Sequence, residues 1–166
     1  MGIAVDIGWY VPWTAGVLGK SMHGLSVCEF GNQRLRNTMG CYKTYKKYLK
    51  AQGVIHTSID INGKDGVISL DLSKPICGMS NRFDIVTNIG VAEHVKDDHW
   101  VFENANNMSK GMVIHILPIG SGYAGHGHRI YTIDEILSHC SEKIVLVEKV
   151  NRANDMAMGV VVAGAK

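Results

Sequence analysis

The chain has 166 residues, of which 46% are hydrophobic and 19% are charged. That balance is typical of one globular domain with a sizeable core and excludes a disordered chain. The formal net charge of +2 is too small to indicate nucleic acid or an anionic membrane as a partner. The four cysteines show no C-x-x-C spacing, and no apolar run approaches the ~20 residues of a membrane span. We therefore expect reduced thiols in a cytoplasmic protein.

The first part of the predicted domain is a strand followed by a helix. Residues 25–30 form a short apolar run that ends at Gly31, which predicts a strand and a turn. Tyrosines and Leu49 then recur at helical spacing over residues 42–50, with lysines in the complementary positions. Gly53 stands where the C-terminal cap of that helix belongs. We interpret the lysines as a solvated helix face rather than a basic binding patch.

Further strands and helices alternate along the chain. Short apolar runs that stop at turn residues predict strands at residues 54–61, 67–72, 83–87 and 112–117. Residues 97–108 carry an apolar stripe at helical spacing and predict a helix. Thr132 with Glu135 three residues later has the pattern of a capping box that begins another helix.

Two β-rich runs, residues 143–150 and 158–163, end the chain. The linker between them is too short for a crossover helix, so we expect the two runs to pair antiparallel. The prediction is an α/β, three-layer, Rossmann-like fold with a seven-stranded, mostly parallel sheet and an antiparallel last strand. We expect residues 25–166 to form this domain and residues 1–24 to be an N-terminal extension or lid.

Acidic residues stand at the ends of three successive predicted strands, as Glu29, Asp60 and Asp71. The carboxyl ends of parallel strands meet at one edge of a sheet, where a carboxylate can bind the hydroxyls of a ribose. Gly31 follows the first strand, and a residue without a Cβ allows the backbone to approach a ligand closely. A single acid here would indicate a turn or a helix cap. Three acids at three strand ends favour a nucleoside site.

Residues 83–95 read FDIVTNIGVAEHV, which predicts a buried strand that stops at Thr87 and Asn88 and turns into a helix carrying Glu93 and His94. This stretch resembles the fourth-strand motif of class I S-adenosylmethionine-dependent methyltransferases, which often runs FDxVxxxxxxEHV. The antiparallel ending is also similar to the methyltransferase fold. The resemblance covers about residues 25–163.

The resemblance implies S-adenosylmethionine as cofactor, S-adenosylhomocysteine as product and an in-line methyl transfer. Asp60 matches the ribose-binding acid of the family, and Asp71 with Leu72 matches the adenine-binding position. The implied cofactor site consists of Glu29, Gly31, Asn32, Asp60, Ile61, Asp71, Leu72, Thr87 and Asn88. The chain departs from the family's glycine-rich E-x-G-x-G-x-G motif, because residues 29–34 read EFGNQR and lack the second and third glycines. Arg34 or Arg36 could hold the carboxylate of the donor.

Three histidines are candidates for a catalytic base, which is needed when the acceptor is a protonated hydroxyl or amine. His94, His126 and His128 lie in segments that follow the fourth and fifth predicted strands. The pair His126-x-His128 could also be half of a metal site. The spacing shows no third ligand, so we expect no metal.

Three functions stay open at this point. The first is a methyltransferase that acts on a small molecule or on an exposed group of a larger one, with a homo- or hetero-oligomer able to complete the acceptor site. The second is a catalytically inactive binding or scaffold subunit of the same fold, which the missing glycines suggest. The third is a nicotinamide-dependent oxidoreductase. It is disfavoured because the chain has no G-x-G-x-x-G, and Asp60 lies more than the usual ~20 residues beyond Gly31.

Overall fold

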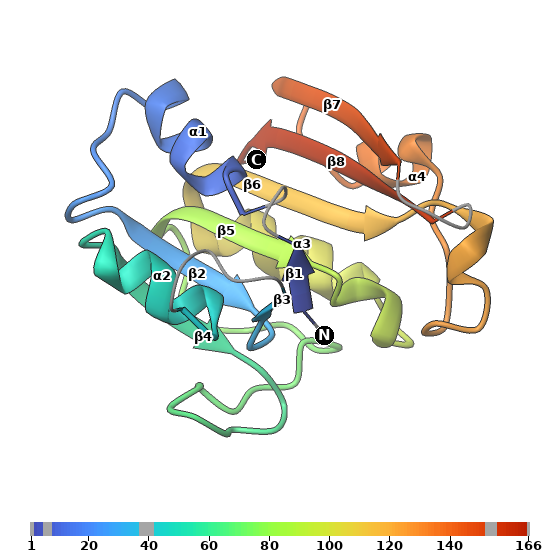
Figure 1. Cartoon of the computed structure of the whole chain (residues 1–166), viewed down its shortest axis with the longest axis horizontal. Helices are drawn as coiled ribbons and strands as arrows, with labels where there is room; N and C mark the ends of the chain where they lie inside the picture. The colour runs from blue at the N-terminus through green and yellow to red at the C-terminus, as the bar shows by residue number, and fades with distance from the viewer. Residues whose placement is uncertain (1, 5–7, 37–41, 152–155, 166) are drawn as a thin grey trace.

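A six-stranded mixed sheet forms the centre of the computed structural model, which describes residues 2–4, 8–36, 42–151 and 156–165 (Figure 1). The strand order is β4-β2-β5-β6-β8-β7. The parallel strands are β2 (Ser26–Phe30), β4 (Ile55–Ile59), β5 (Phe83–Ile89) and β6 (Ser109–Pro118). Strand β8 (Ala157–Gly164) pairs antiparallel with β6 on one side and with β7 (Ile144–Asn151) on the other, so β8 is reversed and β7 runs in the same direction as the parallel strands. A second small sheet pairs β1 (Gly2–Ala4) with β3 (Arg34–Arg36) in parallel.

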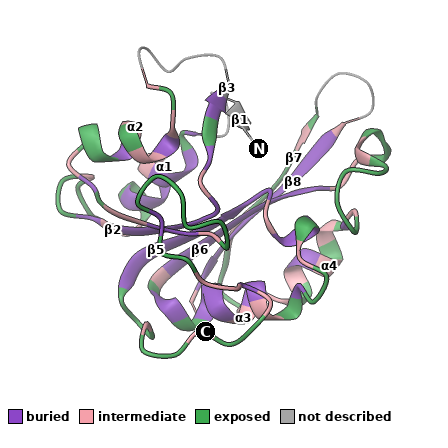
Figure 2. Ribbon diagram, turned by 90° about the horizontal axis from the view of Figure 1, so that it is seen from below, coloured by how far each residue is buried: buried purple, intermediate pink, exposed green. Residues whose placement is uncertain are grey.

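Helices cover both faces of the large sheet, as Figure 2 shows. One face carries α1 (Tyr10–Val17) and α2 (Tyr45–Ala51), and the other carries α3 (His99–Met108) and α4 (Ile133–Ser138). Two short 3-10 turns, η2 (Ala92–His94) and η3 (Ser121–Tyr123), lie in the loops after β5 and β6. None of the helices that the structure describes is long and apolar enough to cross a membrane.

The strands alternate between two apolar cores, because successive side chains of a strand point to opposite faces of the sheet. In β6, Ile114 and Ile116 belong to the core under α1 and α2, whereas Val113 and Leu117 belong to the core under α3 and α4. The three-layer α/β architecture predicted from the sequence is therefore confirmed.

Helix α1 packs into the first of these cores. Tyr10, Val11 and Ala15 are buried there, and the Tyr10 hydroxyl donates to Glu148 Oε2 at 2.6 Å. This packing fixes α1 on the sheet beside β6 and β7. The division into residues 1–24 as an extension or lid and residues 25–166 as the domain stays a prediction.

Several local predictions are confirmed. Thr132 caps α4 in a capping box with Glu135, and β7 and β8 pair antiparallel. Gly53 follows the C-terminus of α2 in the left-handed conformation, with φ of 81°.

The seven-strand count is wrong for the large sheet, because residues 67–72 do not form a strand. Ile68 makes a single parallel bridge with Ile59, and its N–H donates to Ser58 O at 2.9 Å. A parallel neighbour needs a crossover of a dozen or more residues. Residues 60–67 are too few, so they form turns and return the chain to the sheet edge at one point.

The fourth predicted strand is longer than expected. β5 continues past Thr87 and Asn88 to Ile89, because Asn88 and Ile89 still pair with His115 and Ile116 of β6. Glu93 and His94 lie in η2, a short 3-10 helix, rather than in an α-helix.

A buried carboxylate anchors the N-terminal end of β5. Asp84 Oδ2 accepts the N–H of Ser26 at 2.9 Å and its hydroxyl at 2.6 Å, and Oδ1 is paired with Lys20 and Lys110. Burial by itself would raise the pKa of Asp84, but the hydrogen bonds from Lys20, Ser26 and Lys110 lower it below its ordinary value. Asp84 thus joins β5 to the start of β2.

We expect Asp84→Asn to lower the free energy of unfolding at pH 7 by about 1–3 kcal/mol, because the charged hydrogen bonds are lost. The pKa of Asp84 is lower in the folded state than its value of ~3.9 in the unfolded chain. The stabilising contribution of the Asp84 carboxylate is therefore complete above pH ~3.9 and is lost as the pH falls toward the folded-state pKa. Urea denaturation should therefore show a smaller difference from the unaltered protein at pH 3 than at pH 7. Asp97→Asn, at an exposed acid, is the control. An equal loss at both pH values would contradict the role of the charge.

Candidate functional site

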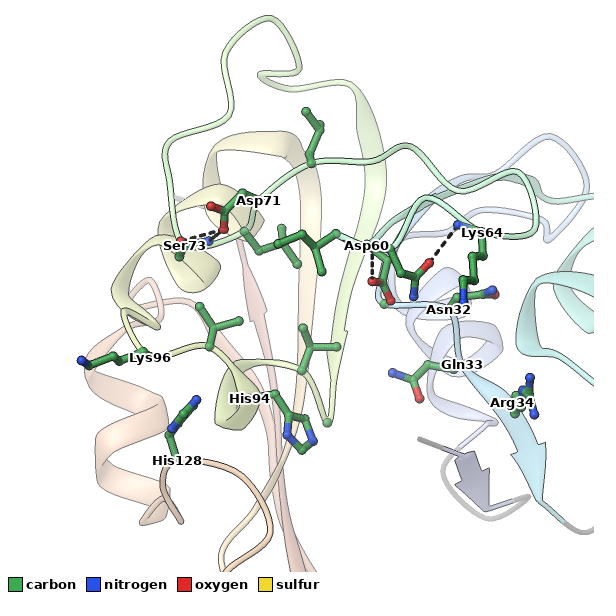
Figure 3. A pocket seen from close by; sticks show the side chains of 18 of the residues that line it. Asn32, Gln33, Arg34, Asp60, Lys64, Asp71, Ser73, His94, Lys96 and His128 are labelled. Carbon is green, nitrogen blue, oxygen red and sulfur yellow. Dashed lines mark hydrogen bonds between the residues drawn. The ribbon is translucent and has the colours of Figure 1, made fainter.

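A cavity of about 980 Å³ opens at the carboxyl ends of the parallel strands (Figure 3). Loops after β2, β4, β5 and β6 line it, together with residues 70–73. After β2 the chain forms β4, which pairs with one side of β2, and then β5, which pairs with the other side. The order in which strands are added to the sheet therefore reverses at β2. Open α/β sheets bind ligands at such a switch point.

The structure brings most of the predicted site residues together in this cavity. Those that line it are Gly31, Asn32, Asp60, Ile61, Asp71, Leu72, His94, His126 and His128. Arg34 lines it as well, whereas the side chain of Arg36 lies outside the described residues. Glu29, Thr87 and Asn88 are buried in the strands and are not among the residues that line the cavity.

Glu29 supports the loop after β2 from inside the protein. Its Oε1 accepts the N–H of Gln33 at 2.9 Å, and its Oε2 lies 2.8 Å from Nε2 of His56. Both side chains of this pair are fully buried. Glu29 therefore holds the turn at Gly31 in place rather than facing the cavity.

The turn after β2 needs its one remaining glycine. Gly31 has φ of 82°, and a Cβ there would lie 3.0 Å from both Gln33 Nε2 and Val91 Cγ2. Asn32, the next residue, is not in the left-handed conformation. Gly31 alone therefore provides the close backbone approach.

Gln33 is a cavity residue that the sequence did not indicate. Its Nε2 donates to Ile89 O at 2.7 Å, which fastens the loop to the end of β5. Its Oε1 is buried and has no hydrogen-bond partner among the described residues. No sequence signal marks this role, because it depends on the side chain folding back over Gly31.

Asp60 and Asp71 lie on opposite sides of the cavity in Figure 3. Asp60 Oδ1 accepts the N–H of Asn62 at 3.0 Å, which shapes the loop after β4. Asp71 accepts both the hydroxyl of Ser73, at 2.6 Å, and its N–H, at 3.0 Å. These bonds, with a further contribution from Lys74, lower the pKa of Asp71 to about 2. Asp71 is therefore an anion at neutral pH.

Asn88 supports the cavity from inside the protein, at the junction of β5 and η2. Its Oδ1 accepts the N–H of Ala92 at 3.2 Å and so fixes the start of η2, and its Nδ2 lies 3.2 Å from Nδ1 of His115. Burial lowers the pKa of His115 to about 3, so this imidazole is neutral and can accept that hydrogen bond. The hydroxyl of Thr87 is buried without a partner among the described residues.

The candidate bases gather on the side of the cavity formed by η2 and the loop after β6. The rings of His94 and His126 have centroids 5.0 Å apart, and His128 also lines the cavity. Burial, followed by the neighbouring His126 and His128, lowers the pKa of His94. Beneath them, the side chain of Glu93 is almost fully buried, with Oε1 3.8 Å from His94 Nε2, and burial raises the pKa of Glu93 to about 7.

Backbone contacts hold the two histidine segments together. The N–H of His128 donates to Glu93 O at 2.6 Å. Gly127 has φ of 93°, and a Cβ there would lie 2.5 Å from Glu93 O. A side chain at position 127 would therefore push the loop away from η2.

We expect Gly127→Ala to destabilise the protein by at least ~1 kcal/mol more than Gly125→Ala. Both glycines have positive φ, but a Cβ at Gly125 meets nothing within 4 Å, so the comparison isolates the clash with Glu93. Urea denaturation measures the difference, and hydrogen exchange at the His128 amide should be faster in Gly127→Ala alone. Equal effects of the two substitutions would show that the loop is not held against η2.

A comparison with protein-family models finds none that matches the chain, and a comparison with curated proteins finds no match. Solved structures do resemble it. The 1,6-didemethyltoxoflavin-N1-methyltransferase of Burkholderia thailandensis, with bound S-adenosylhomocysteine, has a TM-score of 0.66 at 16% identity over 93% of this chain and 76% of that chain. Magnesium protoporphyrin IX methyltransferase from Synechocystis PCC 6803, also with S-adenosylhomocysteine, has a TM-score of 0.69 at 12% identity over 97% and 83%.

The [4+2]-cyclase SpnF has a TM-score of 0.63 at 11% identity, over 92% of this chain and 80% of that chain. At such identities the likeness concerns the fold alone. The chain has the Rossmann-like fold of class I S-adenosylmethionine-dependent methyltransferases.

Proposed function

We propose that this protein is an S-adenosylmethionine-dependent methyltransferase that transfers a methyl group to a small molecule or an exposed group by in-line displacement. One observation carries the proposal: Gly31, Asp60 and Asp71, from three separate loops, line a single cavity at the switch point of the sheet. Two solved structures of this fold contain S-adenosylhomocysteine, which supports the same class of ligand here.

The chemistry of the lining matches the parts of the donor. The carboxylate of Asp60 can accept hydrogen bonds from both ribose hydroxyls. Asp71 is an anionic acceptor for the adenine amine, and Leu72 provides an apolar surface for the ring. The methionine end belongs near the loop after β2, where Arg34, which lines the cavity, can pair with its carboxylate.

The reaction needs little covalent chemistry from the protein. Methyl transfer from a sulfonium depends mainly on holding the nucleophile, the methyl carbon and the sulfur in line. A protonated acceptor also needs a base, and His94, His126 and His128 lie on the remaining side of the cavity. We propose a small-molecule acceptor, whose site a second subunit could complete.

A second candidate is a non-methylating member of the same fold, and two observations favour it. The [4+2]-cyclase SpnF has this fold and is named for a different reaction. In addition, the glycine-rich loop retains only Gly31, and the Gln33 side chain packs over it. Binding of the donor without methyl transfer to any acceptor would support this candidate.

We expect S-adenosylhomocysteine to raise the melting temperature, because a ligand at 100 times its dissociation constant adds ~2.7 kcal/mol to the free energy of unfolding. For a chain of this size the rise should be about 5–10 °C. Differential scanning fluorimetry measures it, with NAD at the same concentration as the control. No rise at millimolar S-adenosylhomocysteine would refute the proposal, and a rise with NAD alone would favour an oxidoreductase.

We expect Asp60→Asn to weaken S-adenosylhomocysteine binding by about 10–100-fold, because the amide replaces one of the two acceptor oxygens that face the ribose hydroxyls with a donor NH₂ group. The asparagine oxygen can still accept the Asn62 N–H, so the melting temperature of the free protein should hardly change. Isothermal titration calorimetry measures the affinity.

The matched control is Asp65→Asn, which removes the same charge from the rim of the same cavity. Asp65 has φ of 58°, a conformation that asparagine tolerates. Equal weakening by both substitutions would indicate a general electrostatic effect and not a ribose contact at Asp60.

A further inference from the structure

Three potential metal ligands meet at the histidine side of the cavity. Glu93, His94 and His126 each offer one ligand atom, and these atoms all lie within 4.8 Å of one another. They come from two segments, η2 and the loop after β6, which explains why sequence spacing showed no third ligand. His94 and His126 are exposed to the cavity, and Glu93 lies beneath them.

The state of Glu93 is a second and independent observation. Its side chain is 1% exposed, and its Oε2 has no hydrogen-bond partner among the described residues. A buried polar atom without a partner destabilises the protein, and does so more strongly when it is charged. A cation bound between Glu93 and the two histidines would give this buried carboxylate an opposite charge.

We propose that Glu93, His94 and His126 bind a divalent transition-metal ion such as Zn²⁺, Mn²⁺ or Co²⁺. Two imidazoles and one carboxylate suit these ions, whereas Mg²⁺ prefers oxygen ligands and water. Ligands about 2.1 Å from one ion lie at most ~4.2 Å apart, so small rotations of the two exposed rings complete the site. Three protein ligands leave at least one position open, as in catalytic metal sites.

The backbone around the cluster is already fixed without the ion. Asn88 Oδ1 accepts the N–H of Ala92 at the start of η2, and the N–H of His128 donates to Glu93 O. Gly127 allows these two segments to approach each other. Metal binding therefore requires side-chain rotation and no rearrangement of the loops.

The role of the ion rests on the proposed methyltransferase function, whereas the metal site itself does not. The open position faces the cavity because His94 and His126 line it. An acceptor hydroxyl bound there is acidified by the ion and loses its proton to solvent in the open cavity. The O–CH₃ bond then forms as the CH₃–S⁺ bond breaks, with the electron pair remaining on sulfur. The site thus assigns the acceptor to the class of hydroxyl compounds.

The test is a Co²⁺ titration of the full chain after removal of metals with a chelator, followed by visible absorption. We expect one ion per chain, displaced by Zn²⁺ and not by Mg²⁺. Glu93→Gln and His126→Ala should each weaken binding at least tenfold, since even residues that merely support a ligand have effects of that size. His23→Ala, at an exposed histidine before β2, is the matched control and should bind as the unaltered protein does. Acetohydroxamate, a bidentate oxygen ligand, should change the spectrum if a coordination position is open.

Several results would overturn the inference. Absence of stoichiometric Co²⁺ binding would do so, as would full binding by His126→Ala, an exposed residue whose loss should not affect folding. No response to acetohydroxamate would overturn the open position and with it the hydroxyl acceptor. S-adenosylhomocysteine binding to the metal-free protein is measured in parallel. If S-adenosylhomocysteine binds but Co²⁺ does not, the metal site is refuted and the proposed function stands. If Co²⁺ binds but S-adenosylhomocysteine does not, the metal site stands and the proposed function is refuted.

Discussion

The central position of β5 constrains the rest of the structure. Every residue of Phe83–Ile89 is buried, and β5 pairs in parallel with β2 on one side and β6 on the other. Val86 lies in register with both Cys28 and Val113. A shift of one residue would exchange the two apolar cores, so the register is strongly fixed. The parallel strands therefore end together, and their loops surround one cavity.

The two ends of β5 serve different purposes. Near the N-terminal end, Asp84 joins β5 to Ser26 and to two lysines, which contributes to stability away from the cavity. At the C-terminal end, Asn88 and Ile89 fasten η2 and Gln33, which shape the cavity itself. The contacts that anchor β5 and those that shape the cavity thus lie at opposite ends of this strand.

The cavity joins two chemically different sides. Asp60 and Asp71 offer acceptors suited to a nucleoside, whereas Glu93, His94 and His126 offer ligands suited to a metal ion. In methyl transfer the donor and the acceptor must meet along one line. A donor held by the acidic side, with an acceptor held by the histidine side, is consistent with that requirement.

The sequence by itself determined the alternation of strands and helices, the capping box at Thr132, the antiparallel ending and the presence of acids near strand ends, because these features depend on local periodicity and turn chemistry. It predicted a strand at residues 67–72 from their apolar side chains. These residues do not show that the connection after β4 is too short to bring another parallel strand to the sheet, so only one bridge forms there. Only the tertiary structure decided that Glu29 and Asn88 support the cavity from within, that Gln33 folds over Gly31, and that His126 joins Glu93 and His94. The physical reason is that each of these contacts joins separate segments of the chain, so it depends on the packing of the sheet rather than on spacing along the chain.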